Sequence, residues 1–228
     1  RRFLQEQLPR GVVFGFIEDD NTASLAISRR AGYVPIASVV AENYAVLRPA
    51  AVAGVRRLEA QERERLQDCL ETLYAGHDLT DFDQSVVPEQ CWVLERGGVW
   101  VAALQAERRR FELVDLGYRG WLKRAVPWIP VVRQLVDPRD YRFLWYQHLW
   151  FREDQPGAIF DLMQGVLYAM GHRLANLQFD RRSPVYARWR RSGRLGPLAV
   201  FRNGFQVMAD LRDLAPTGRP ILCTTRGA

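Results

Sequence analysis

The chain has 228 residues, of which 48% are apolar and 11% aromatic, so it can bury a sizeable core and is not a polar, intrinsically disordered chain. Its formal charge of +6 comes almost wholly from arginine, and acidic residues are scattered among the basic ones, which gives little support to nucleic-acid binding. No apolar run reaches the roughly 20 residues of a membrane span, which argues against a membrane protein.

The cysteines Cys69, Cys91 and Cys223 lie far apart and form no CxxC pair. This odd and dispersed set argues against a disulfide framework or a zinc site and favours the reducing cytoplasm. The histidines show no metal-ligand spacing, so no metal is expected. The chain opens on Arg1 and Arg2 without an apolar leader, so we expect no signal peptide and a start inside a longer protein.

The first 50 residues predict the end of a helix and then a strand, a helix and two strands. Asn21 is a good N-cap for this helix, and Gly32 is a good stop. The segment 48–54 is rich in Pro, Ala and Gly and predicts a linker. The predicted elements are the helix end at 3–8, strands at 12–18, 34–40 and 43–47, and a helix at 22–31.

Residues 55–228 predict a longer series of strands and helices. Arg96-Gly97-Gly98 between two β-rich runs is a strong hairpin signal, because the tightest hairpin turns need positive φ. The run 142–151 is apolar on both faces and predicts a central strand. Three prolines interrupt 118–138, which predicts a packed insertion. The predicted strands are 55–58, 92–95, 99–106 (continued or followed by 111–116), 142–151, 174–179, 200–207 and 221–225, and the helices are 61–74, 158–172 and 183–192.

The order strand, polar cap, short arginine-rich helix, glycine and two strands occurs twice. Residues 21–32, Asn-Thr-Ala-Ser-Leu-Ala-Ile-Ser-Arg-Arg-Ala-Gly, correspond to residues 183–193, Ser-Pro-Val-Tyr-Ala-Arg-Trp-Arg-Arg-Ser-Gly. A repeat of this size predicts two copies of one domain, and the first copy lacks its front half.

These elements resemble the GNAT superfamily of acyl-CoA-dependent acyltransferases. The family order is strand, one or two helices, three antiparallel strands, helix, strand, helix and two strands. The stretch from Glu18-Asp-Asp-Asn21 to Arg30-Ala-Gly-Tyr33 resembles the family's strand-end Asn, short helix and Gly-aromatic sequence. The resemblance implies an α/β (α+β) fold: a mixed, mostly antiparallel sheet with a splayed parallel central strand pair, flanked by helices.

The resemblance also divides the chain. Residues 1–50 are expected to be the C-terminal half of a first GNAT-like domain, and residues 51–228 a complete second one. Family enzymes bind acyl-CoA where two parallel central strands splay apart, so the resemblance implies acetyl-CoA as a co-substrate. The strand pair that must lie side by side in the same direction is 142–151 and 174–179.

The family's pyrophosphate loop falls on Arg-Glu-Asp-Gln-Pro-Gly-Ala, directly after the central strand. The resemblance makes Arg152, Gly157 and Ala158 cofactor-binding candidates there, since small residues at a helix start let backbone N–H groups approach a phosphate. The two acidic residues of the loop would repel it, so an ordinary acidic helix start is the alternative. Asn21 stands at the family's strand-end Asn in the first copy, with a plain N-cap as the alternative.

Tyr146 and His148 are the catalytic candidates. They share one face of the central strand if its side chains alternate, and His148 has a suitable ordinary pKa for a general base. A buried core histidine is the alternative. The family's tyrosine acid is not supported, because its position falls on Ser28 in the first copy and Tyr186 comes a turn too early in the second.

Two functions follow. One is acyl-CoA-dependent N-acyltransfer, with acetyl transfer to an amine of a small molecule or peptide. Its working acetyl-CoA site is expected in the N-terminal copy, with the C-terminal copy supporting the fold or the acceptor site. The other is a catalytically inactive GNAT-like binding or dimerisation module, favoured by the acidic loop and the missing tyrosine. Nucleic acid and membrane are not expected as partners, and a homodimer is left open.

Overall fold

The computed structural model describes residues 13–78, 82–111, 135, 140–200, 202–210 and 219–221. The predicted helix end at 3–8, nearly all of the insertion at 118–138 and most of the strand at 221–225 lie outside these residues. None of the helices in the described part of the chain is long and apolar enough to cross a membrane.

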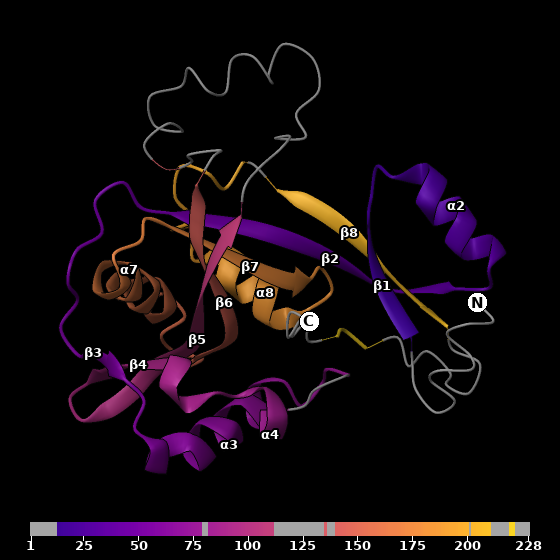
Figure 1. Ribbon diagram of the computed structural model, residues 1–228. Helices are drawn as coiled ribbons and strands as arrows, with labels where there is room; N and C mark the ends of the chain where they lie inside the picture. The colour runs from indigo at the N-terminus through magenta and orange to yellow at the C-terminus, as the bar shows by residue number, and fades with distance from the viewer. Residues whose placement is uncertain are drawn as a thin grey trace.

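In this part of the chain, eight strands form one continuous sheet in the order β1-β8-β2-β7-β6-β5-β4-β3 (Figure 1). Neighbouring strands are antiparallel except β6 and β7, which run parallel. The predicted fold class is confirmed. The strands are β1 (Val13–Glu18), β2 (Val34–Ala45), β3 (Val55–Arg57), β4 (Cys91–Arg96), β5 (Val99–Phe111), β6 (Tyr141–Phe151), β7 (Leu174–Asp180) and β8 (Asn203–Asp210). The helices are α2 (Thr22–Arg30), α3 (Arg63–Leu73), α4 (Phe82–Ser85), α7 (Ala158–Met170) and α8 (Pro184–Arg191), with short 3-10 turns at Ala60–Glu62 and Pro88–Gln90.

β2 is one long strand, so the prediction of two strands at 34–40 and 43–47 is wrong. Its first part pairs with β8 and its last part with β7. The polar residues Glu42 and Asn43, which interrupt the apolar pattern, are held inside the β7 ladder opposite Leu177 and Asn176. The Asn176 side-chain amide donates to Asn43 Oδ1 at 3.1 Å, so a half-buried polar partner on β7 accommodates Asn43 inside the strand.

The two parts of the chain are interleaved in the sheet. β8 lies between β1 and β2, and β2 lies between β7 and β8. Asp19, just after β1, ties the parts together through the Arg181 guanidinium (3.0 Å) and the Gln206 amide (2.9 Å). The sheet is therefore continuous across the predicted boundary at 50/51, and the division into two domains stays a prediction.

The β4–β5 hairpin lies where the sequence predicts it, whereas two strand ends differ from the predicted ones. The β4–β5 hairpin closes through Gly97 and Gly98, both at positive φ (+57° and +75°), as a two-residue turn of this type requires. β5 runs on to Phe111, the first residue of the predicted segment at 111–116, and the rest of that segment lies outside the described residues. β8 begins at Asn203 instead of the predicted residue 200, because residues 197–200 form a turn in which the Ala199 N–H donates to the Gly196 carbonyl at 3.3 Å.

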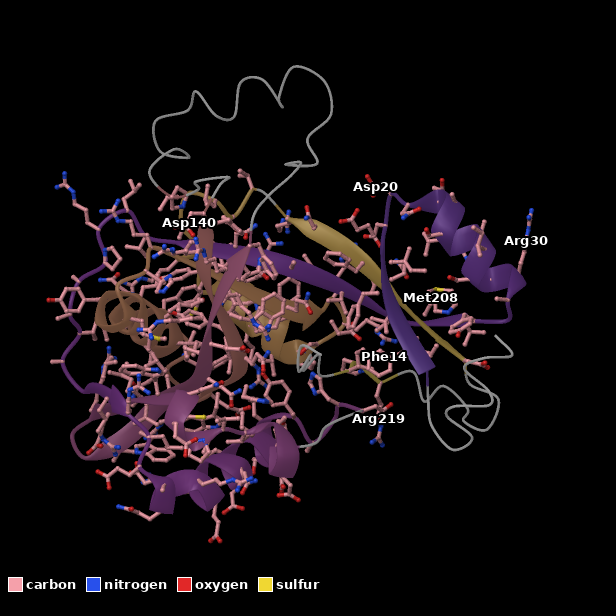
Figure 2. The ribbon with its side chains drawn as sticks, viewed as in Figure 1. Phe14, Asp20, Arg30, Asp140, Met208 and Arg219 are labelled. Carbon is pink, nitrogen blue, oxygen red and sulfur yellow. The ribbon has the colours of Figure 1, made fainter. Side chains whose placement is uncertain are left out.

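The main core lies around β3 to β7 (Figure 2). α7 packs against β4, β5 and β6, and its Phe160 stacks on Trp189 of α8 with ring centroids 5.5 Å apart. α3 contacts β6 and buries Leu66 and Leu70 completely. By contrast, Phe14 at the β1 end of the sheet is 49% exposed. The best-packed part of the molecule thus surrounds the parallel strand pair.

Candidate active site at the β6–β7 split

The parallel strands β6 and β7 separate part-way along their length. Three consecutive residue pairs join them, from Leu144–Ala175 to Tyr146–Leu177. Beyond this point β6 stays paired with β5, and β7 stays paired with β2. The two strands thus lie side by side in the same direction, as predicted for 142–151 and 174–179, and then diverge. We call the gap between them the β6–β7 split.

A β-bulge at His148 accounts for the split. Ala103 and Gln105 are two residues apart on β5, whereas their partners on β6, Trp150 and Gln147, are three residues apart. His148 takes the extra position with φ +48°, and among the described residues no other non-glycine has a positive φ. A left-handed residue costs about 1–2 kcal/mol, and a bulge bends its strand. The His148 ring is held edge-on against Phe82, at a centroid distance of 5.7 Å, so packing supports the strained position.

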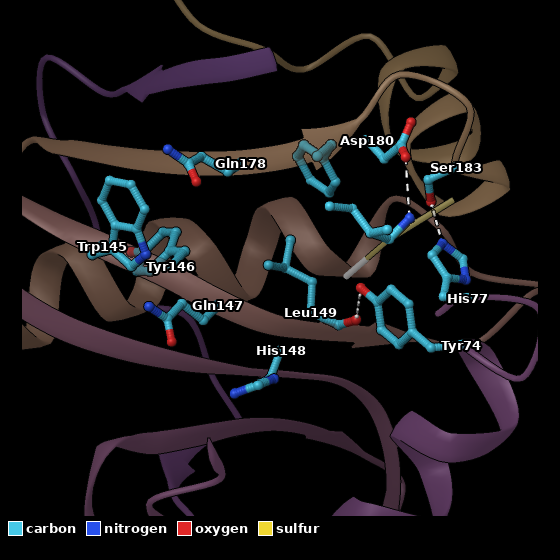
Figure 3. Close-up of a pocket in the computed structure, with 12 residues that line it drawn as sticks. Tyr74, His77, Trp145, Tyr146, Gln147, His148, Leu149, Gln178, Asp180 and Ser183 are labelled. Carbon is cyan, nitrogen blue, oxygen red and sulfur yellow. Dashed lines mark hydrogen bonds between the residues drawn. The ribbon is translucent and has the colours of Figure 1, made fainter. Parts of the chain in front are cut away.

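A small cavity lies at the split, between β6, β7, the end of α3 and the turn before α8 (Figure 3). Its volume of about 20 Å³ has room for little more than one water molecule. It is lined by Tyr74, His77, Trp145, Tyr146, Gln147, His148, Leu149, Gln178, Phe179, Asp180, Ser183 and Ile221.

Residues 219–221 pass beside this cavity, which Ile221 lines, and are here called the strap. Ile221 lines the cavity, and it is only 7% exposed. Its side chain belongs to a small apolar cluster with Val39 and Val207. Three hydrogen bonds hold the strap. They run from the Ile221 N–H to Asp180 Oδ2 (3.0 Å), from the Asp78 N–H to the Pro220 carbonyl (2.9 Å) and from the Arg182 guanidinium to the Arg219 carbonyl (3.1 Å).

No family model and no curated protein sequence matches the chain. Solved structures do. A GCN5-related N-acetyltransferase from Sphaerobacter thermophilus superposes with a TM-score of 0.51 at 14% identity, over 92% of this chain and 64% of that one. The chain has the GNAT fold. The N-myristoyltransferase of Saccharomyces cerevisiae with bound myristoyl-CoA superposes with a TM-score of 0.47 at 8% identity, over 77% of this chain and 50% of that one. The chain therefore spans about two thirds of the length of the Sphaerobacter protein and about half of the length of the yeast protein.

The predicted pyrophosphate loop of the GNAT fold connects β6 to α7. Gly157 is the N-cap of α7, with open space where a side chain would stand, and Ala158 is the first helical residue. Arg152 follows β6 directly. The structure thus brings the three cofactor-binding candidates together at one end of α7, and their role in binding stays a prediction.

The charges of this loop are already paired. Arg152 makes two hydrogen bonds of 3.0 Å with the carboxylate of Asp154. Glu153 pairs with Arg188 of α8 at 2.5 Å. Because these groups are largely exposed, each pair is weak and can exchange for another anion. The loop therefore offers two arginines to a phosphate only in competition with two neighbouring acids.

Tyr146 and His148 line the cavity, but their side chains contact different helices. The Tyr146 hydroxyl donates to the Met163 carbonyl of α7 at 2.8 Å, whereas His148 packs on Phe82 of α4. The prediction that they share one face is wrong, because the bulge breaks the alternation between them. Burial raises the pKa of Tyr146 well above its usual value and lowers the pKa of His148 to about 4, the latter partly offset by the Ser85 backbone. Their catalytic role stays a prediction without support from this geometry.

Asn21 and Tyr186 have structural roles. Asn21 Oδ1 accepts the Ser24 N–H at 3.1 Å, so the N-cap interpretation is confirmed, and Asn21 does not line the split. The Tyr186 hydroxyl donates to Glu42 Oε1 of β2 at 2.5 Å, and burial raises the tyrosine pKa. A cofactor role for Asn21 stays a prediction.

His77 and Ser183 are site residues that sequence reasoning missed. A hydrogen bond of 2.8 Å joins His77 Nε2 to Ser183 Oγ at the edge of the cavity (Figure 3). Both side chains are buried, at 8% and 3% exposure. Burial lowers the pKa of His77, opposed by the negative charge of Asp180. The position of Ser183 at the end of β7 was a usable signal, but nothing in the sequence links it to His77, 106 residues away.

Proposed function

We propose that the chain is an acyl-CoA-dependent N-acyltransferase that transfers an acetyl group from acetyl-CoA to an amine. The observation that supports this function is the split itself, where a parallel strand pair opens at a bulge and leaves the facing edges of β6 and β7 unpaired with each other. Edges of this kind offer backbone N–H groups that can hold a thioester carbonyl and stabilise the oxyanion formed on attack.

The acyl-CoA would run from this split to the start of α7. Its pyrophosphate would lie at Gly157 and Ala158, near the N-terminal end of the helix dipole. Arg152 and Arg188 would exchange their present acidic partners for the phosphates. Acyl-CoA binding and the preference for acetyl-CoA are our proposal, supported by the GNAT fold that the chain shares with the N-acetyltransferase from Sphaerobacter thermophilus.

Binding requires that the strap move. A cavity of about 20 Å³ cannot hold a thioester and its acyl group, and the buried side chain of Ile221 is part of its lining. This observation favours the alternative function, a GNAT-like binding or dimerisation module that no longer takes acyl-CoA. The two functions differ in one measurable property, which is affinity for acyl-CoA.

Isothermal titration of the chain with acetyl-CoA tests the proposal. We expect saturable binding that weakens when Arg152 and Arg188 are both changed to Ala and is unchanged in Arg30→Ala, a matched substitution on α2. Linkage gives a parallel readout, because ligand at about 100 times its Kd should stabilise the fold by about 2.7 kcal/mol. Absence of binding at millimolar acetyl-CoA, with a folded chain, would leave the inactive module as the function.

The acceptor is proposed to be an amine of a small molecule or a peptide, in the cytoplasm. Thiol release from acetyl-CoA in the presence of each acceptor class tests this part. A homodimer remains part of the alternative function, and sedimentation of the chain with and without acetyl-CoA measures it.

A further inference from the structure

We propose that His77 and Ser183 form a proton relay at the β6–β7 split, with His77 as the general base. This inference rests on the proposed function. It assigns a proton-transfer role to two residues from distant parts of the chain, the loop after α3 and the N-cap of α8.

The geometry places the pair at the reacting end of the split. Ser183 and His77 both line the cavity, and Ser183 follows β7 directly after the β7–α8 turn. The Ser183 hydroxyl lies 2.8 Å from His77 Nε2, a length that permits proton transfer between them. Their backbone positions are fixed as well. The His77 N–H donates to the Tyr74 carbonyl at 2.8 Å, and Ser183 caps α8 by accepting the Tyr186 N–H.

The surroundings of His77 keep its ring neutral, so that Nε2 is available to accept a proton. Its Nδ1 is buried and has no hydrogen-bond partner among the described residues, which disfavours the doubly protonated ring. The ionisable groups that face it are Tyr74 from α3, Asp78 beside it, and Asp180 with its partner Arg182 from the β7–α8 turn. Asp180 attracts the imidazolium once it forms, and Arg182, held to Asp180 at 2.7 Å, limits this attraction.

The relay can carry the proton through the whole acyl transfer without another reactant. The acceptor nitrogen attacks the thioester carbonyl, and as the C–N bond forms its N–H proton passes to Ser183 Oγ while Ser183 gives its own proton to His77 Nε2. When the C–S bond breaks, the thiolate leaves with the electron pair. The imidazolium proton then returns through Ser183 to the sulfur, which regenerates both side chains. The relay thus supplies the acid as well as the base, and the family's tyrosine is not needed.

Steady-state kinetics with acetyl-CoA and the best amine acceptor, measured from pH 5 to 9, test the relay. We expect His77→Gln, which keeps a polar partner for Ser183 but cannot take the proton, to lower kcat by about 10²–10⁴-fold. It should also remove the acidic limb of the wild-type profile. Ser183→Ala should lower kcat similarly, and Ser183→Thr, which keeps both the hydroxyl and the cap, should restore most of it. His172→Gln, the same change away from the split, is the control.

The outcomes separate the relay from the proposed function. A wild-type chain that transfers the acetyl group, together with a His77→Gln variant of equal kcat and unchanged pH profile, overturns the relay alone. A wild-type chain that neither binds acetyl-CoA nor releases its thiol overturns the proposed function and the relay with it. If His77→Gln or Ser183→Ala proves unstable, Ser183→Asn decides, because asparagine also caps a helix but has no hydroxyl to pass the proton. Loss of kcat in folded Ser183→Asn supports the relay, and unchanged kcat overturns it.

Discussion

Weakening the strap should open the split to acyl-CoA. We predict that Ile221→Ala binds acetyl-CoA more tightly than the wild-type chain does. Ile221 is 7% exposed, and burying such a side chain contributes about 1.5–3 kcal/mol. If the strap must leave before ligand enters, its stability is subtracted from the binding free energy. Loss of about 2 kcal/mol from the strap therefore tightens the apparent Kd by at most about 30-fold.

Titration calorimetry on the two chains measures this effect, with unfolding curves to establish that both are folded. Val200→Ala is the matched control, because Val200 is an apolar residue just before β8 that is 78% exposed. Equal or weaker binding by Ile221→Ala would refute the reasoning, since it would mean that the strap does not compete with the ligand.

Three further predictions concern strain, acidity and charge. Gly54→Ala should destabilise the fold more than Gly97→Ala does, as measured by urea unfolding. Both glycines have positive φ, but of the two only Gly54 would bring a Cβ against a backbone atom, the Glu95 carbonyl oxygen at 2.1 Å. Equal losses of unfolding free energy in the two variants would contradict this. The pKa of His148 is about 4 in the folded chain and near 6.5 in the unfolded chain. As the pH falls between these two values, the unfolded chain binds a proton that the folded chain does not. The free energy of unfolding therefore decreases by on the order of 3 kcal/mol. His148→Asn, which tolerates positive φ and does not titrate, should lose less stability between pH 7 and 4.5, and parallel losses would count against the buried neutral ring. Changing Glu153→Gln and Asp154→Asn together should strengthen acetyl-CoA binding several-fold at low salt and less at high salt, because Arg152 and Arg188 are then free for phosphate; salt-independent affinity would rule this out.

Local features of the fold could be predicted because short-range chemistry determines them. Asn21 and Ser183 cap their helices through the N–H groups of Ser24 and Tyr186, three residues on in each case. The hairpin at Gly97 follows from two adjacent residues that accept positive φ. The parallel pairing of β6 with β7 followed from the order of elements and from the resemblance to the GNAT family.

Long-range features could not be predicted in this way. The sequence predicts two strands, at 34–40 and 43–47, where the structure has β2 alone. The partners that β7 and α8 supply to Glu42 and Asn43 make these polar residues suitable for a strand interior. The bulge at His148 has no local signal, since the run from Arg142 to Phe151 reads as an uninterrupted strand. The prediction of the site residues was the least successful. The bulge orients His148 away from Tyr146, and tertiary contacts place residues from other segments at the site.

Two features of the site depend on tertiary contacts. One is the hydrogen bond between His77 and Ser183, and the other is the hydrogen bond that holds Ile221 to Asp180 beside the split. Each depends on segments more than 40 residues apart meeting at the end of β7. Sequence patterns report which side chains a segment offers, whereas the identity of the partner depends on how the whole sheet is assembled.

The most direct test is an NMR titration of the isotope-labelled chain with acetyl-CoA. We predict saturable shifts of the backbone amides at 147–149 and 178–180, on the facing edges of β6 and β7, together with those of Gly157 and Ala158. Absence of saturable shifts at the split, while the chain remains folded, would contradict the proposal that this gap is an acyl-CoA site.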